Sequence, residues 1–194
     1  MRAGFACYAG KCIQKLAAMK TRAQLQTQLD AAFNNYLELT SLLYKDMESM
    51  LLTESNSQQW RRNFIRASAA LLEGEAHCLR EMCLVGLRCN ASTLTKKERS
   101  AIIDERGTDA NNRLKLTLRA AYKLFSLQPA PDFSSTEWVR AQRVLRKRHR
   151  LMHPKRPRDL GMSDRTWSEL RRDTAWLMKQ FFDFLSLGQQ KYGS

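Results

Sequence analysis

Apolar residues recur every three or four positions along most of the chain, which is the period of an amphipathic α-helix. Two long helices are predicted first, over about residues 21–52 and 58–88, and a polar break at 54–57 separates them. No stretch shows the two-residue alternation of a strand, so no sheet is expected. The apolar stripe of the first helix contains Leu25, Leu29, Ala32, Phe33, Tyr36, Leu39, Leu43, Met47 and Met50, and that of the second contains Phe64, Ala67, Leu71, Ala76, Leu79, Met82 and Leu87.

Shorter helices are predicted over about 96–104 and 109–127, and two more begin near Ser134 and Ser163. Thr95 and Glu98 have the spacing of a capping box, in which each residue's side chain bonds the other's backbone N–H. The helix from Ser134 should bury Trp138, Val139, Val144, Leu145 and Leu151.

The last helix carries a heavy aromatic and aliphatic face. It reads as core or dimer interface rather than as a platform for stacking RNA bases. Its members are Trp167, Leu170, Ala175, Leu177, Met178, Phe181, Phe182 and Leu185.

Together these patterns predict an all-α, antiparallel helical bundle of about five to six helices. We expect residues 1–20 to form an N-terminal extension and residues 21–190 to form the bundle domain. Lys11 and Lys15 interrupt any apolar run near the start, so a signal peptide is not expected, and Met19 is a possible alternative start.

The chain is strongly basic, with 33 Lys and Arg against 19 Asp and Glu and a formal net charge of +14. Such a balance favours a polyanionic partner, and nucleic acid fits it best. An anionic membrane fits less well, because no segment approaches the roughly 20 apolar residues of a spanning helix. We therefore expect no membrane association.

Five cysteines, an odd number, match no zinc-binding spacing, and no CxxC motif occurs. Free thiols in a reducing compartment are the simplest interpretation, so a cytoplasmic location is predicted.

Glu73 and Glu75 lie in the middle of the second long helix. Solvated surface acids are the favoured interpretation for both, and an acid that faces a basic site is the alternative.

The stretch with the clearest chemistry is Arg148-His149-Arg150-Leu151-Met152-His153-Pro154. Five positions along a regular helix turn a side chain by about 140°, so Arg148 and His153 would not face one point. Pro154 disfavours the α conformation at His153 and should let it leave the helix. No acid occurs between Glu137 and Asp159. An arginine and a histidine in such a cationic segment suit a phosphodiester.

Arg148, the polar His149 and the His153–Pro154 pair resemble the signature of the HEPN superfamily: an arginine, a polar residue, and a histidine after a gap of four to six. The resemblance implies a metal-independent endoribonuclease that needs no cofactor, because RNA supplies its own nucleophile, the ribose 2′-hydroxyl. His153 would then assist proton transfer and Arg148 would hold the phosphate. His149 would be a second proton carrier or would only position the phosphate.

Other cations around the motif are expected to attract RNA phosphates without reading bases. The resemblance further implies a homodimer, in which two motifs meet in one cleft, and a toxin, abortive-infection or phage-defence role. An antitoxin or another regulatory protein is a possible partner. In toxins of this kind that are regulated by modification of a tyrosine, that tyrosine lies two places after the histidine. This chain has Lys155 there, so such regulation is not expected. The phosphate-attracting residues are predicted to be Arg143, Lys147, Arg150, Lys155 and Arg156.

The alternative is a non-catalytic basic module that binds nucleic acid or a partner protein. In that case His153 would merely cap a carbonyl at the end of a helix. The two interpretations differ in how specifically function depends on Arg148 and His153, since a binder would lose about one phosphate contact per cation removed.

Overall fold

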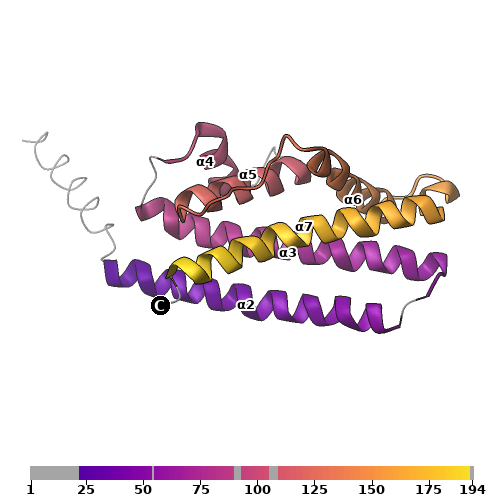
Figure 1. Cartoon of the computed structure of the whole chain (residues 1–194), viewed down its shortest axis with the longest axis horizontal. Coiled ribbons are helices and arrows are strands. Elements are labelled where there is room, and N and C mark those ends of the chain that lie inside the picture. Colours follow the sequence, from indigo (N-terminus) through magenta and orange to yellow (C-terminus); the bar gives the residue numbers. More distant parts are fainter. Residues whose placement is uncertain (1–21, 54, 90–92, 105–108, 193–194) are drawn as a thin grey trace, which may run out of the picture.

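The computed structural model describes residues 22–53, 55–89, 93–104 and 109–192. Within them the predicted all-α bundle is confirmed (Figure 1). The expected N-terminal extension, residues 1–20, lies outside the described part, as do 90–92 and 105–108. Six α-helices and one 3₁₀ helix occur in the described ranges: α2 (Arg22–Leu52), α3 (Gln58–Cys89), α4 (Lys96–Ile103), α5 (Ala110–Leu124), α6 (Thr136–Met152), η2 (Pro157–Leu160) and α7 (Asp164–Tyr192).

The two long helices α2 and α3 run antiparallel along the whole length of the bundle (Figure 1). At one end the indole N–H of Trp60 donates to the Met50 carbonyl at 3.1 Å. At the other end Arg88 donates to the side chain of Gln28 at 2.7 Å. The predicted bounds of both helices are correct to within a residue or so, because their apolar stripes are continuous.

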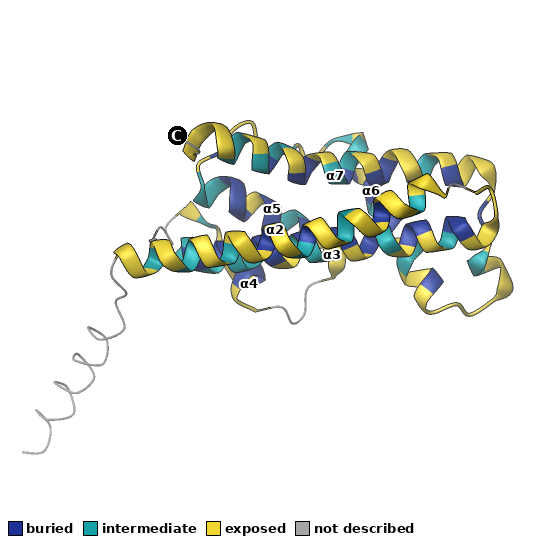
Figure 2. Ribbon diagram, turned by 90° about the horizontal axis from the view of Figure 1, so that it is seen from below, coloured by how far each residue is buried: buried dark blue, intermediate teal, exposed yellow. Residues whose placement is uncertain are grey.

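The other helices pack around α3, which is the central element. α5 covers the C-terminal half of α3, where Leu124 lies against Gly86. α6 covers the N-terminal half, where Arg66 donates to the Leu151 carbonyl at 3.3 Å. α7 lies alongside α6 and α3, and its burial pattern is shown in Figure 2.

Aromatic rings from α3 and α7 form the core next to the start of both helices. The Trp167 ring meets those of Trp60 and Phe64 edge-on, at centroid distances of 5.3 and 5.0 Å. Phe181 is also buried, so core is the correct interpretation for these two members of the α7 face.

The predicted core was wrong at Val139, and two residues of the α7 face, which was predicted as core or dimer interface, do not lie in the core. Val139 is 57% exposed and Phe182 is 51% exposed, and Ala175 is exposed as well. In each case a neighbour one or two positions away occupies the buried side of the helix instead. The buried neighbours are Trp138 next to Val139, Phe184 near Phe182, and Thr174 next to Ala175.

The segment between α6 and α7 is held by side chains from the beginning of α3. The Gln58 amide exchanges two hydrogen bonds with the Met162 backbone, at 2.7 and 2.8 Å. The buried Arg61 donates to the Met162 carbonyl at 3.0 Å and to the Asp164 carboxylate at 2.5 Å. These bonds hold the start of α7 against the start of α3. None of the described helices combines the length and the apolar character needed to cross a membrane.

Candidate functional site

The helix α6 carries the motif and has well-defined ends. The Ser135 side chain accepts a hydrogen bond from the Trp138 backbone N–H at 3.2 Å and so caps its start. At its end the His153 backbone N–H donates to the His149 carbonyl at 3.0 Å, and His153 itself has left the helical conformation. The following Pro154 has no N–H and cannot continue the ladder. The predicted end of the helix at His153 is therefore confirmed.

His149 and His153 lie one helical turn apart on the solvent side of α6. Their ring centroids are 5.1 Å apart and the rings are tilted by 51°. Both residues are exposed. Two exposed imidazoles at this separation are accessible to one ligand.

Two arginines share this face of the helix with the histidines. Arg146, His149, Arg150 and His153 follow the i, i+3, i+4, i+7 spacing that places side chains above one another along a helix. All four residues are exposed. We call them the exposed stripe. Arg146 was not predicted as a site residue, although its spacing from His149 was visible in the sequence.

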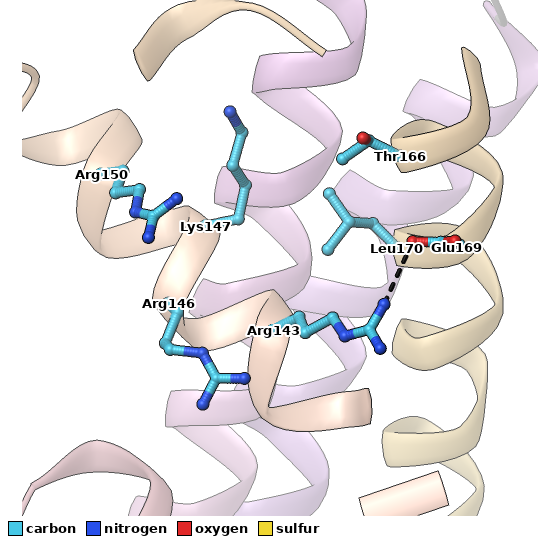
Figure 3. Close-up of a pocket in the computed structure, with 7 residues that line it drawn as sticks. All are labelled: Arg143, Arg146, Lys147, Arg150, Thr166, Glu169 and Leu170. Carbon is cyan, nitrogen blue, oxygen red and sulfur yellow. Dashed lines mark hydrogen bonds and ion pairs between the residues drawn. The ribbon is translucent and has the colours of Figure 1, made fainter. Parts of the chain in front are cut away.

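The cations on the α7 side of α6 line a cavity of about 250 Å³ between the two helices (Figure 3). The structure brings together here three of the predicted phosphate-binding residues, Arg143, Lys147 and Arg150, with Arg146 beside them. The remaining lining residues are Thr166, Glu169 and Leu170.

Three of these cations already have partners, and for Arg146 the partner is the side chain of Gln142, to which it donates at 3.3 Å. Arg143 forms an ion pair with Glu169 at 3.1 Å, which is visible in Figure 3. The Lys147 ammonium donates to the carbonyls of Asp159 and Gly161, at 2.9 and 2.8 Å. Burial, together with the neighbouring Arg150 charge, lowers the pKa of Lys147. Lys147 thus ties α6 to the segment that follows it, whereas Arg146 and Arg150 remain exposed for an anion.

Lys155 and Arg156 lie where the chain leaves α6. Their backbone N–H groups both donate to the Asp159 carboxylate at 3.0 Å, and their side chains are exposed. The bond from the Lys155 N–H is the main cause of the lowered pKa of Asp159. The two side chains extend the basic surface beyond the end of α6.

Arg148 faces the opposite side of α6, toward α3 and α5. It forms an ion pair with Glu73 at 3.0 Å and lines a second cavity of about 390 Å³. In a helix its side chain points about 100° away from that of His149. No hydrogen bond joins Arg148 to His153 in the ranges that the structure describes. The structure therefore separates the predicted arginine from the two histidines of the same chain.

The expectation of a solvated surface acid is wrong for Glu75, whereas Glu73 is exposed, at 42%, and also faces the basic motif. Glu73 pairs with Arg148 across 75 positions of sequence, so an acid does lie at the motif arginine. Glu75 is 1% exposed and accepts a hydrogen bond from the hydroxyl of Tyr36. Burial raises the pKa of Glu75, although the hydrogen bond from Tyr36 opposes the shift.

The cysteines in the described part of the chain agree with the prediction of free thiols. Cys78 and Cys83 are both free and buried in α3. Burial raises the pKa of each thiol, so neither is poised as a nucleophile. Cys7 and Cys12, and the side chain of Cys89, lie outside the description.

Comparison of the chain with protein-family models, with curated proteins and with solved structures found no match. The resemblance to the HEPN superfamily therefore remains a prediction from the motif. What the chain does must be inferred from the geometry at the end of α6.

Proposed function

We propose that the chain is a metal-independent endoribonuclease of the HEPN type, acting at the exposed end of α6. The observation that carries the proposal is the pair of exposed histidines, 5.1 Å apart, flanked by exposed arginines on one helical face. A net charge of +14 supplies the general attraction for RNA.

The chemistry needs only groups that this face carries. One histidine removes the proton of a ribose 2′-hydroxyl, whose oxygen attacks the adjacent phosphorus. The other histidine gives a proton to the departing 5′-oxygen, so the products are a 2′,3′-cyclic phosphate and a free 5′-hydroxyl. Guanidinium groups offer fixed donors to the phosphate oxygens and stabilise the charge that develops on them. His153 and His149 take the proton-transfer roles.

The identity of the phosphate-binding arginine has two candidates. Arg148 is implied by the motif, but within one chain it faces Glu73 and not the histidines. A homodimer that places two α6 ends together would let Arg148 of one chain reach the histidines of the other. Arg146 lies on the histidine face of the same chain, so it would serve a site made by one chain.

The first experiment incubates the purified chain with mixed RNA in the presence of EDTA. We expect cleavage with 2′,3′-cyclic ends, and a loss of about 10²- to 10⁴-fold in rate for His153→Ala, because acid–base assistance is worth about that much. The matched control is Arg165→Ala, which removes a 90% exposed cation on α7 and should leave the rate nearly unchanged. Full activity in His153→Ala, or activity that requires added Mg²⁺, would refute the proposal.

A mixing experiment separates the two arginine candidates. Arg148→Ala and His153→Ala chains are assayed alone and together. If the site is shared between two chains, mixing restores part of the activity, because one of the two sites in a mixed dimer contains both intact residues. If one chain makes the site, mixing restores nothing, and Arg146→Gln rather than Arg148→Gln should abolish cleavage.

A role as a toxin, abortive-infection or phage-defence effector rests on the resemblance, with an antitoxin or other regulatory protein as its partner in the cytoplasm. Production of the wild-type chain in bacteria should then arrest growth, and production of His153→Ala should not. Equal growth with both chains would count against this role while leaving the RNA chemistry open to the cleavage assay.

A non-catalytic basic module is the second candidate, and the Arg148–Glu73 ion pair favours it, because that arginine is already neutralised in one chain. Such a module would bind RNA without cleaving it. Each cation removed from the exposed stripe should then reduce the slope of log affinity against log salt concentration by about the contribution of one phosphate contact. His153→Ala would change neither that slope nor the integrity of the RNA.

A further inference from the structure

The cavity that Arg148 lines is built from three helices and lies apart from the exposed stripe. Its volume of about 390 Å³ falls in the range of about 300 to 1,000 Å³ that is usual for small-molecule sites. Sequence reasoning did not find it, because its walls come from segments far apart in the chain. The lining residues on α3 are Leu72, Glu73, Ala76, His77 and Arg80, those on α5 are Ala110, Arg113, Leu114 and Thr117, and those on α6 are Leu145 and Arg148.

One part of this lining is apolar, and the other is mainly cationic, with the Glu73 carboxylate among three arginines. Leu72, Ala76, Leu114 and Leu145 offer an aliphatic surface of the kind that a flat aromatic ring covers. The cationic part carries three guanidinium groups. Arg80 is paired with Glu81 at 2.9 Å and Arg148 with Glu73 at 3.0 Å. The ligand that matches both parts has a planar ring and an anionic group, as a nucleotide does.

A buried hydroxyl adds a third feature. Thr117 lines the cavity and is 1% exposed, and its Oγ1 has no hydrogen-bond partner among the described residues. A buried polar group without a partner destabilises a folded protein, so such groups are uncommon. A ligand with a polar edge would satisfy this hydroxyl, which can both donate and accept.

We propose that this cavity binds one nucleotide of the RNA, with the nucleobase against the aliphatic surface, the phosphate at Arg113 and Arg148, and the Thr117 hydroxyl on the edge of the base. The proposal rests on the proposed function for the choice of RNA as the source of the nucleotide. It gives the chain a base-selecting subsite on a different face of α6 from the histidines. Binding of the phosphate requires Arg148 to break its ion pair with the Glu73 carboxylate.

The test is calorimetric titration of the whole chain with the four ribonucleoside 5′-monophosphates, and in parallel with inorganic phosphate and the uncharged nucleosides. At least one nucleotide should bind about tenfold more tightly than both phosphate and its own nucleoside. Thr117→Val should weaken that nucleotide about fivefold, the worth of one hydrogen bond. The thermal unfolding midpoint of Thr117→Val should equal or exceed that of wild type, because the variant loses an unpaired polar group.

The matched control is Thr174→Val. Thr174 is also 1% exposed with an unpartnered hydroxyl, but it lies on α7 and does not line the cavity. It should leave nucleotide affinity unchanged. A uniformly 2′-O-methylated oligonucleotide, which lacks the attacking hydroxyl, should displace the bound nucleotide.

Several outcomes would overturn the subsite: no nucleotide binding, equal binding of inorganic phosphate, or the same loss of affinity in Thr174→Val as in Thr117→Val. Failure of the oligonucleotide to compete would overturn the assignment to RNA and leave a free nucleotide as the ligand. These readouts are binding affinities, so they are independent of cleavage. Loss of cleavage in His153→Ala would still support the proposed function even if the subsite failed.

Discussion

The buried carboxyl of Glu75 should make the stability of the bundle fall as pH rises. Glu75 is 1% exposed between α2 and α3, and burial raises its pKa above the ordinary value of 4.5. In the unfolded chain the same group ionises near that ordinary value. A group with a raised folded-state pKa contributes its full stability below the unfolded pKa, and the contribution is lost as pH rises through the folded pKa.

The size of the effect follows from the one proton that the Glu75 carboxyl keeps in the folded chain and has lost in the unfolded chain. While Glu75 is protonated in the folded chain and ionised in the unfolded chain, each pH unit costs up to about 1.4 kcal/mol of unfolding free energy. Glu75→Gln removes this dependence, because the amide has almost the same shape, does not titrate and can still accept from the Tyr36 hydroxyl. The variant should therefore gain stability relative to wild type as pH rises from about 4.5 through the folded-state pKa of Glu75.

Urea unfolding of both chains at pH 5, 6 and 7 measures the difference directly, and the other titrating groups cancel in it. The control is Glu38→Gln, which changes an exposed acid on α2 and should show no trend in its difference from wild type. A difference between Glu75→Gln and wild type that stays constant over this range would refute the reasoning.

Trp167→Ala should lower the unfolding free energy by about 3 to 5 kcal/mol, since it empties the centre of a three-ring core, and urea unfolding would show it. Thr95→Ala should cost about 1 kcal/mol, because it removes one half of the capping box that begins α4; hydrogen exchange of the α4 amides should accelerate with it. Glu73→Gln should change stability by less than about 1 kcal/mol, because the pair with Arg148 is partly exposed. The same variant should bind RNA more tightly in filter-binding assays, and unchanged affinity would show that Glu73 does not compete with phosphate for Arg148.

Local chemistry determined most of the secondary structure. The continuous apolar stripes predicted α2 and α3, and the Thr95–Glu98 spacing predicted the start of α4. Pro154 predicted that α6 ends at His153, since the steric restriction acts on the preceding residue alone. The grouping of Arg146, His149 and Arg150 was equally local, because helix geometry sets it, and His153 follows directly at the C-cap.

Tertiary packing decided which of these residues face one another. Glu73 and Arg148 are 75 positions apart, and only the packing of α6 on α3 brings them together. The packing of α2 on α3 buried Glu75 against Tyr36, and the packing of α3, α5 and α6 enclosed Thr117 in a cavity of three helices. A helix determines the angle between its own side chains, but not which of its faces meets another helix, because that depends on burying apolar surface over the whole chain. For this reason the motif, and the angle between its arginine and its histidines, could be predicted from the sequence, whereas the pairing of that arginine with Glu73 could not.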